Sequence, residues 1–319
     1  MLKGWFKSPW ELRRQAVLGM NSRNIKYISR YNERQRYPLV DDKLQTKEAA
    51  QKAGIAVPEL LAVIEGQWQL KGLQKLMSGW DQFVIKPTRG SGGKGIQVIT
   101  GRDFDFYIRS NGNKMEWGAI RRHINNILSG LYSLGGKPDR VMIEALINYD
   151  NVFNDYTYEG VPDIRVIVFR GFPIMAMLRC STHSSDGRAN LHQGAIGVGI
   201  DICTGHSMLA VQHGRPVHEH PDTGKAFSEL SIPYWDTILE LAAGCFEMTG
   251  LGYIGCDIVL DRDQGPVILE LNARPGLAIQ LACGLGLGKR LSLVEHFEPA
   301  MLELPPAERV NLIQSVLAI

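Results

Sequence analysis

A glycine-rich stretch between two apolar runs is the first place in this sequence where chemistry is expected. Residues 83–100 read FVIKPTRGSGGKGIQVIT, and Gly90, Gly92 and Gly95 satisfy the pattern G-x-G-x-x-G. Glycines leave backbone N–H groups open to phosphate oxygens, because no Cβ stands in the way. Lys86 lies in the apolar run before them, where a lysine can serve as a point charge for phosphate. The stretch predicts a phosphate-binding loop, with a tight turn that binds no ligand as the alternative.

The residues around the glycines distinguish among the known kinds of phosphate loop. A dinucleotide-binding turn opens onto a helix, whereas IQVIT after this loop is β-branched and predicts a strand. A Walker A loop needs Ser or Thr after its lysine, but Lys94 is followed by Gly95. The protein-kinase pattern needs Val where Gln97 stands. What remains is a glycine hairpin between two strands that can fold over phosphates.

A second group of polar side chains is expected to bind a metal ion. GYIGCDIVLD and GPVILELNA predict two strands joined by a turn at 262–265. Glu270 and Asn272 are two residues apart, so they share one face of their strand, and Asp257 can lie opposite them. Three oxygen-bearing side chains on strands rich in Ile, Val and Leu are costly to bury unless a cation lies among them. Carboxylate and amide oxygens suit Mg²⁺, so the trio predicts a magnesium site; either acid alone is typical of a surface residue.

The remaining patterns predict the elements that hold these groups in place. Apolar residues at helical spacing, capping aspartates and terminal glycines mark helices, and β-branched runs mark strands. The predicted elements are helices over 41–54, 116–130 and 231–250, a strand over 141–147, a hairpin over 163–180, and polar loops over 148–162 and 181–195. Helices and antiparallel hairpins in this order predict an α+β fold rather than a doubly wound parallel sheet.

Composition excludes several functional classes. The chain of 319 residues is 45% hydrophobic and 21% charged, which is ordinary for a globular protein. Its net charge of +2 predicts neither a nucleic-acid-binding protein nor a protein that binds a membrane surface through its charge. No run is long enough to span a bilayer, and the start lacks the apolar stretch of a signal peptide. The 5 cysteines have no C-x-x-C spacing, so we expect reduced thiols that fill the core of a cytoplasmic protein.

Two further segments have two interpretations each. Residues 1–40 carry an excess of basic side chains, which indicates a solvated helix face or a contact with an acidic polymer or anionic surface; within it, 19–37 is either a basic wall for an acidic substrate or a packing helix. The segment 206–220 contains His206, His213, His218 and His220, but their spacing matches no zinc pattern. A solvated hairpin tip is the favoured interpretation of that segment.

The ordered set of motifs resembles one superfamily. DDKLQTK, FVIKPTRGSGGKG, VMIEALI, DIR, RANLHQGA and GCDIVLD…VILELNARPGL resemble the ATP-grasp superfamily, and within it the alpha-L-glutamate ligase-related branch, over residues 41–290. The resemblance implies an α+β fold in which two lobes grip ATP between antiparallel sheets. It divides the chain into a basic helical extension (1–40), a small lobe with the glycine flap (41–147) and a large lobe with the metal-binding hairpin and C-terminal helices (148–319).

The resemblance also implies an ATP site and its residues. Lys43 and Lys86 correspond to the two lysines that hold the phosphates. The glycine flap comprises Gly90, Ser91, Gly92, Gly93, Lys94 and Gly95. The adenine edge is read by Glu144 with the backbone of Ala145, Leu146 and Ile147, and Asp163 is the ribose-side acid.

The same comparison implies the metal and substrate residues. Asp257, Glu270 and Asn272 correspond to ligands of two Mg²⁺ ions, with Glu270 as the bridge and Mn²⁺ as an alternative ion. Arg165, Arg179, Arg188 and Asn190 correspond to positions near the transferred phosphate and the acyl substrate, although a hydrogen-bonded loop explains Asn190 equally well. Some peptide-forming relatives carry an arginine two places before the metal-binding aspartate; Gly255 stands there, so Arg274 is expected to supply the charge.

The activity implied is ATP- and Mg²⁺-dependent joining of a carboxylate to an amine through an acyl phosphate. The substrates would be a small carboxylate and an amine or peptide, for example glutamate or another amino acid added to a peptide or protein, with no nucleic acid involved. About forty residues precede Lys43, too few for the N-terminal domain typical of the superfamily, so the substrate class is not inherited. The alternatives are a phosphotransferase acting on a carbohydrate or small molecule, and a non-catalytic ATP-binding module.

Overall fold

The structure, a computed structural model, describes residues 8–90 and 93–318. Ser91 and Gly92 of the expected glycine flap therefore lie outside the described residues. The chain divides into two compact units. The small unit comprises residues 41–48 and 57–148, and the large unit comprises 1–40, 49–56 and 149–319.

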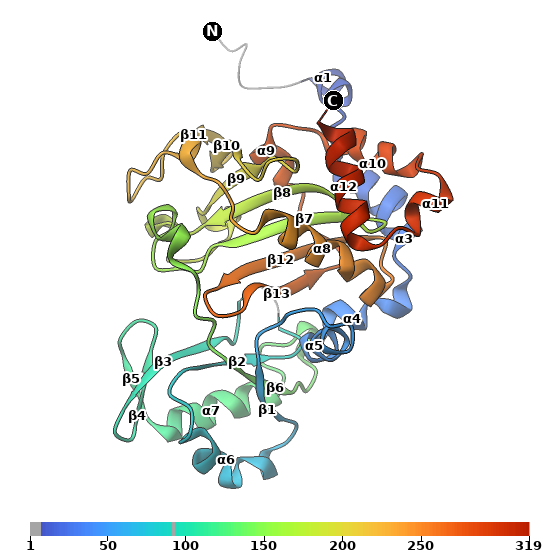
Figure 1. Ribbon diagram of the computed structural model, residues 1–319. Helices are drawn as coiled ribbons and strands as arrows, with labels where there is room; N and C mark the ends of the chain where they lie inside the picture. Colours follow the sequence, from blue (N-terminus) through green and yellow to red (C-terminus); the bar gives the residue numbers. More distant parts are fainter. Residues whose placement is uncertain (1–7, 91–92, 319) are drawn as a thin grey trace. The chain divides into compact units, whose positions relative to one another are not determined.

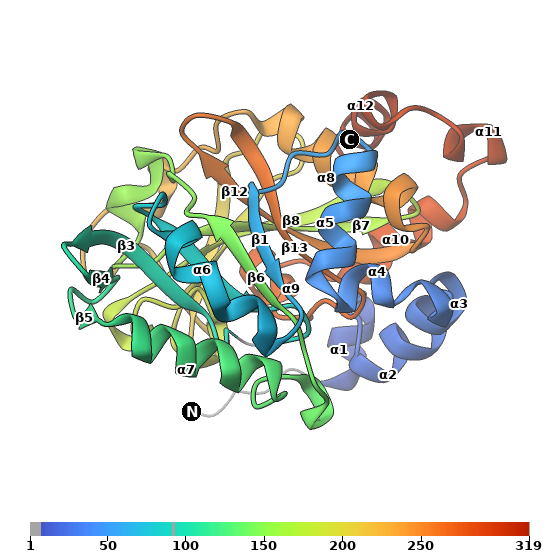
Figure 2. The same ribbon diagram turned by 90° about the horizontal axis from the view of Figure 1, so that it is seen from below.

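The small unit is built on a six-stranded antiparallel sheet with the order β1-β6-β2-β3-β4-β5. Its strands are β1 (Leu60–Ile64), β2 (Phe83–Pro87), β3 (Gln97–Asp103), β4 (Phe106–Arg109), β5 (Lys114–Met115) and β6 (Val141–Ala145). Helices α6 (Leu70–Met77) and α7 (Trp117–Leu128) lie along one face of it (Figure 2). Ile120, Ile124 and Ile127 of α7 recur at helical spacing and are fully buried against the sheet, which gives this unit its own core.

The large unit is built on a seven-stranded sheet with the order β11-β10-β9-β8-β7-β12-β13, and all of its strand pairs are antiparallel. The strands are β7 (Asp163–Phe169), β8 (Phe172–Cys180), β9 (Ile196–Ile200), β10 (Ser207–Gln212), β11 (Arg215–Val217), β12 (Tyr253–Asp261) and β13 (Gly265–Asn272). Arg170 and Gly171 join β7 to β8 with positive φ angles of 50° and 84°, as a two-residue hairpin turn requires.

Helices cover both faces of the large sheet (Figure 1). They are α8 (Trp235–Thr249), α9 (Ile279–Cys283), α10 (Leu287–Glu295), α11 (Pro299–Leu302) and α12 (Pro306–Leu317). Helix α8 packs on β7, β8, β12 and β13, whereas α9 packs on β8, β9 and β10. Helix α8 begins at Trp235, later than the predicted residue 231; Ile232 of the predicted stripe precedes the helix but is buried all the same.

The N-terminal segment packs into the core of the large unit. It contains α1 (Pro9–Arg14), α2 (Met20–Ser22), a π-helical turn over Arg23–Ile28, α3 (Ser29–Tyr31) and α4 (Pro38–Asp41). Tyr27 and Ile28 are buried in the same apolar cluster as Phe169 and Tyr253. Asn32 is 3% exposed; its amide group donates to Tyr253 O at 2.7 Å and Ala273 O at 3.2 Å, and it accepts from Tyr253 N at 2.8 Å. These contacts favour the packing interpretation of residues 19–37.

The predicted fold class is confirmed. Helices combine with two antiparallel sheets, and the hairpins predicted on either side of residues 170–172 and 262–265 are both present. The predicted helix after Asp42 is α5 (Lys43–Lys52), whose first turn donates to the Asp42 carboxylate from Leu44 N at 3.1 Å. All five cysteines are reduced. Within residues 8–90 and 93–318, no helix has the length and apolar character needed to cross a bilayer.

Candidate functional site

The glycine loop joins one strand to the next, as its sequence predicts. Strands β2 and β3 pair antiparallel, with Phe83 opposite Ile99 and Ile85 opposite Gln97. Gly95 cannot be replaced without strain. Gly95 has a φ of 78°, and a Cβ on it would come within 2.7 Å of the Tyr132 ring. The backbone at Gly95 therefore passes close to the Tyr132 ring.

Lys86, at the end of β2, is part of a buried group of three charges. It is 7% exposed and forms an ion pair with Glu144 on the adjacent strand β6. The second oxygen of the Glu144 carboxylate, Oε1, lies 2.6 Å from Nζ of Lys47 on α5. Lys47 also donates to the carbonyl oxygen of Pro58. The buried carboxylate is thus shared between two lysines, which leaves a net positive charge in this part of the small unit.

Lys47 was not among the residues predicted from the sequence. It is 4% exposed, and burial lowers the pKa of its ammonium group, although the Glu144 carboxylate opposes this shift. The signal was available in DDKLQTK, because Lys43 and Lys47 are four residues apart and share one face of a helix. Lys43 itself donates to the carbonyl oxygen of Gly90 at 2.9 Å, so its ammonium group lies at the glycine loop.

The expected adenine-reading segment has two parts with different surroundings. The Glu144 side chain is engaged by the two lysines. The backbone N–H of Ala145 donates to Glu59 O at 3.0 Å, and Ala145 is the last residue of β6. Leu146 and Ile147 follow it outside any strand and are half-buried.

In the glycine loop, Gly93 and Lys94 are exposed.

In the large unit, strand register brings the predicted metal ligands together. Asp257 on β12 is the direct partner of Glu270 on β13, and Asn272 is the partner of Gly255. Directly opposed residues in an antiparallel pair point to the same face, so all three polar side chains lie on one side of the sheet. The amide nitrogen of Asn272 donates to Oδ2 of Asp257 at 3.3 Å, which shows that the side chains meet.

Asp257 is also bound by two arginines, one from the neighbouring strand β7 and one from β8, the strand beyond it. Arg165 on β7 donates to Oδ1 at 2.7 Å and to Oδ2 at 2.6 Å, and Arg179 on β8 donates to Oδ2 at 2.8 Å. Asp257 is 2% exposed. Burial raises the pKa of its carboxyl group, but the guanidinium groups of Arg179 and Arg165 outweigh burial, so that the pKa lies below its usual value. Asp257 is therefore a buried, charged carboxylate.

Asp163, the expected ribose-side acid, is bound to Arg179. Both of its carboxylate oxygens accept from that guanidinium group, through Nε at 2.7 Å and through Nη2. Asp163 is buried, and burial raises the pKa of its carboxyl group above the usual value, more than Arg179 lowers it. Arg179 thus bridges two buried aspartates, and with Arg165 it completes a cluster of two acids and two guanidinium groups.

The remaining predicted residues lie apart from this cluster. Arg188 is exposed and pairs with Asp186 at 3.5 Å. Asn190 accepts from His192 N at 3.0 Å and so caps the short 3₁₀ turn Leu191–Gln193, which agrees with the interpretation as a hydrogen-bonded loop. The guanidinium carbon of Arg274 lies 4.9 Å from the centre of the Tyr37 ring. The charge beside Asp257 therefore comes from Arg165 and Arg179.

The oxygen donors on β12 and β13 fit a magnesium ion. Oδ1 of Asp257 accepts from Arg165 Nε, and a carboxylate oxygen has a second lone pair for a metal. Glu270 is half-buried directly opposite it, and Asn272 turns its amide nitrogen to Asp257, which leaves the amide oxygen as a donor. A set of two carboxylates and one amide oxygen is the hard donor chemistry that Mg²⁺ takes in phosphate-handling sites.

The histidine segment differs in part from its predicted form. Strands β10 and β11 do form a hairpin, and His213 and Gly214 make its turn with φ angles of 50° and 74°. His220 was expected at a solvated tip, but it is fully buried, with Nε2 at 3.0 Å from Ser181 O and Nδ1 accepting from Asp222 N at 3.3 Å. Over the described ranges, no cluster of His, Cys, Asp and Glu has the geometry of a metal site formed by those residues alone.

One family model matches most of the chain. The family model described as "Sugar-transfer associated ATP-grasp" matches residues 22–296, which include both charged groups. Among solved structures, the chain is similar to the ATP-grasp ligase PsnB in complex with its minimal precursor, with 14% identity and a TM-score of 0.44; the match covers 89% of this chain and 63% of that one. A search of curated proteins gave no match.

Two further solved structures have a similar extent of match. The D-alanine–D-alanine ligase from Coxiella burnetii is 14% identical with a TM-score of 0.48, over 89% of this chain and 61% of that one. The RimK domain ATP-grasp protein from Sphaerobacter thermophilus is 16% identical with a TM-score of 0.45, over 82% of this chain and 70% of that one. The chain thus spans about three-fifths of the length of PsnB and of the Coxiella ligase.

Proposed function

Because the chain belongs to the sugar-transfer-associated ATP-grasp family, we propose that it is an ATP- and Mg²⁺-dependent ligase that joins a carboxylate to an amine. The observation that carries the proposal is the extent of the family match, which spans residues 22–296. It includes the buried Lys47 and Lys86 of the small unit, and Asp257 and Glu270 of the large unit. A protein that had lost catalysis would have little reason to keep both groups.

The small unit supplies the positive charge for a triphosphate. Lys86 lies at the end of the strand that leads into the glycine loop, and Lys43 lies at Gly90 within that loop. Sharing Glu144 between Lys47 and Lys86 leaves the lysine group net positive, so that Lys86 retains charge for phosphate oxygens. The glycine backbone adds N–H donors, and the segment after β6, with Ala145, is assigned to the adenine edge.

The large unit supplies the metal ligands and the cationic groups for the transferred phosphoryl group. Asp257, Glu270 and Asn272 would hold the metal, with Glu270 as the bridge if two ions bind. When bound, Mg²⁺ neutralises charge on the phosphate oxygens. Arg165 and Arg179 keep Asp257 charged and present guanidinium groups on the same face of the sheet. Arg188 and Asn190 belong to the polar loop that follows β8 in the chain and are assigned to the substrate side.

The proposed reaction has two steps. A carboxylate oxygen of the substrate attacks the γ-phosphorus of ATP, the bond to the bridging oxygen breaks, and ADP leaves with that electron pair. The amine nitrogen then attacks the carbonyl carbon of the acyl phosphate, the C–O bond breaks, and inorganic phosphate leaves as the amine loses a proton. Alignment and charge neutralisation are what the protein contributes, and no side-chain nucleophile is needed.

A second candidate is phosphoryl transfer to a carbohydrate. The description of the family as sugar-transfer associated favours it, because the same lysines and acids could serve a hydroxyl acceptor. The two candidates differ in their products. A ligase releases ADP and phosphate only when both a carboxylate and an amine are present, whereas a kinase moves the γ-phosphate label into a stable product.

The experiment is a screen of amino acids, small peptides and sugar acids with Mg²⁺ and ATP, read by mass spectrometry of the products and by ADP release. We expect a new amide product for at least one pair of substrates. Lys86→Ala and Glu270→Ala should abolish turnover with the fold retained, and the matched controls Lys75→Ala and Glu240→Ala, which change exposed residues, should keep it. Undiminished turnover in either site variant contradicts the proposal.

A further inference from the structure

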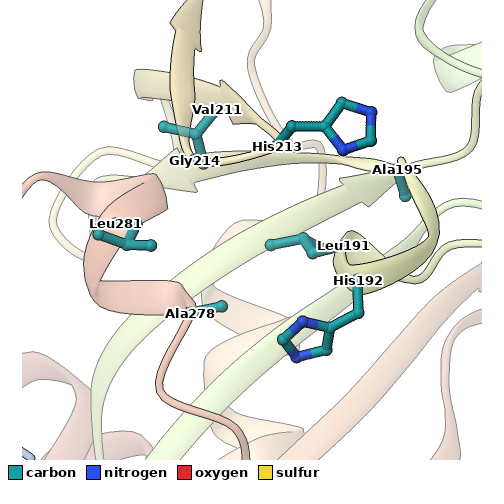
Figure 3. Close-up of a pocket in the computed structure, with 8 residues that line it drawn as sticks. All are labelled: Leu191, His192, Ala195, Val211, His213, Gly214, Ala278 and Leu281. Atoms are coloured by element: carbon teal, nitrogen blue, oxygen red, sulfur yellow. The ribbon is translucent and has the colours of Figure 1, made fainter.

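A pocket of about 310 Å³ lies in the large unit, beside the loop that contains Asn190 (Figure 3). Leu191 and Leu281 point toward one another across it, and Ala278 lies below them in this view. The imidazole rings of His192 and His213 lie on the side of the 191–195 loop. Leu281 is 58% exposed, so the pocket presents an apolar wall to solvent.

The pocket lies on the same face of the large sheet as the arginine–aspartate cluster. Gly197 on β9 is the direct partner of Arg179 on β8, so a side chain at Gly197 would point to the face on which Arg179 lies. A Cβ there would come within 2.8 Å of Leu191 Cδ2 and 3.3 Å of Ala282 Cβ. The absence of a side chain at Gly197 therefore makes room for Leu191 and α9, and Leu191 lies on the Arg179 face.

The lining combines aliphatic side chains with two imidazoles. The pocket is lined by Leu191, His192, Ala195, Val211, His213, Gly214, Ala278 and Leu281, and none of these is a carboxylate, an ammonium or a guanidinium group. The aliphatic side chains stabilise an apolar group by removing it from water, and the lining offers an acidic side chain no ammonium or guanidinium partner. A volume at the lower end of the range for ligand pockets fits a small molecule rather than a peptide.

We propose that this pocket binds the apolar side chain of an amino acid substrate of about the size of leucine. The inference rests on the proposed function, since it assigns the substrate class to the face on which Arg179 and Asp257 lie. The polar end of the amino acid lies at the mouth, where imidazole N–H groups can donate to it. The glutamate expected from the family resemblance is therefore disfavoured at this position.

The test measures binding without catalysis. Saturation-transfer NMR with L-leucine and with L-glutamate as probes, in the absence of ATP, reports contact of each side chain with the protein. We expect saturation of the leucine methyl groups, weaker saturation of glutamate, and at least a tenfold loss of leucine affinity in Leu281→Glu. Leu76→Glu changes a leucine of similar exposure in the small unit and should leave leucine binding unchanged.

The outcomes separate this inference from the proposed function. Equal or stronger binding of glutamate, no leucine binding, or unchanged affinity in Leu281→Glu overturns the pocket assignment. ADP release measured in parallel with each amino acid and an amine or carboxylate partner tests the ligase. Leucine binding without ADP release would leave the pocket assignment standing and count against the ligase, whereas ADP release with glutamate alone would do the reverse.

Discussion

Arg165 on β7 and Asp257 on β12 are direct cross-strand partners, and the guanidinium group of Arg165 donates to both carboxylate oxygens of Asp257 at 2.7 and 2.6 Å. A positive charge beside Asp257 therefore comes from the neighbouring strand β7. A guanidinium group in this bidentate arrangement fixes the orientation of the carboxylate as well as its charge. The pair therefore defines how Asp257 is presented on its face of the sheet.

Removing Arg165 should destabilise the large unit. In Arg165→Ala, the buried Asp257 keeps only Arg179 as a cationic partner, and breaking a buried ion pair costs about 3 to 5 kcal/mol. Urea denaturation should show a lower midpoint for this variant. Arg262→Ala, which changes an exposed arginine at the β12–β13 turn, is the control and should match the wild type. Equal midpoints for all three proteins would show that the pair contributes little.

Lys47 is expected to act as a positioning residue for Lys86. In Lys47→Met, the Glu144 carboxylate retains only Lys86 as an ionic partner and should draw it away from phosphate oxygens. We expect the KM for ATP to rise about tenfold, which corresponds to about 1.4 kcal/mol of binding free energy, with a smaller change in kcat.

A double variant separates this role from a merely structural one. Adding Glu144→Gln to Lys47→Met removes the charge that competes for Lys86, so it should restore part of the ATP affinity. Lys52→Met, at an exposed position on the same helix, should leave the KM unchanged. If the double variant binds ATP no better than Lys47→Met, the competition for Lys86 is not the cause.

Part of the candidate site could be predicted from the sequence, and part could not. The strand–glycine–strand pattern around Lys86 and the alternation of Glu270 and Asn272 are local, so the hairpins and their faces could be predicted. The sharing of Glu144 between Lys47 and Lys86 brings together α5, β2 and β6, which are far apart in the chain. The spacing of Lys43 and Lys47 predicts that they share a helix face, but their contacts with other elements depend on tertiary packing, which this spacing does not predict.

The same limit applies to the surroundings of two other side chains. Arg274 adjoins Asn272 in sequence, but its guanidinium group lies over Tyr37, because the N-terminal segment packs beside it. His220 follows a polar hairpin, yet its imidazole is buried and bound to the carbonyl of Ser181. In both cases a distant segment determines the surroundings of the side chain, and neither segment is identifiable from the local residue pattern.

Asn32 should be necessary for the stability of the segment that follows β13. It is buried and makes hydrogen bonds to Tyr253 and to the carbonyl oxygen of Ala273, so Asn32→Ala leaves buried backbone groups unsatisfied at a cost of about 1 to 3 kcal/mol. Hydrogen exchange followed by mass spectrometry should show faster exchange at 273–276. The exposed Asn21→Ala is the control. An unchanged exchange rate at 273–276 in Asn32→Ala would mean that Asn32 does not stabilise this segment.

The buried thiols should be unreactive in the folded protein. Burial raises the pKa of the Cys283 thiol to about 12, so at pH 8 only about one molecule in ten thousand carries the reactive thiolate. Cys180, Cys245 and Cys256 are buried as well, whereas Cys203 is half-buried. Iodoacetamide labelling followed by mass spectrometry should modify Cys203 first and the others only after denaturation. Rapid native labelling of Cys283 would contradict its burial.

In the proposed function, the lysines of the small unit bind the nucleotide, and the acids of the large unit bind its metal. Calorimetric titration of ATP, with and without Mg²⁺, into the wild type, Lys86→Ala and Glu270→Ala tests it most directly. We expect Lys86→Ala to weaken ATP binding under both conditions, and Glu270→Ala to weaken it only when Mg²⁺ is present. Equal affinity in all three proteins, or a Glu270→Ala defect that persists without Mg²⁺, would contradict it.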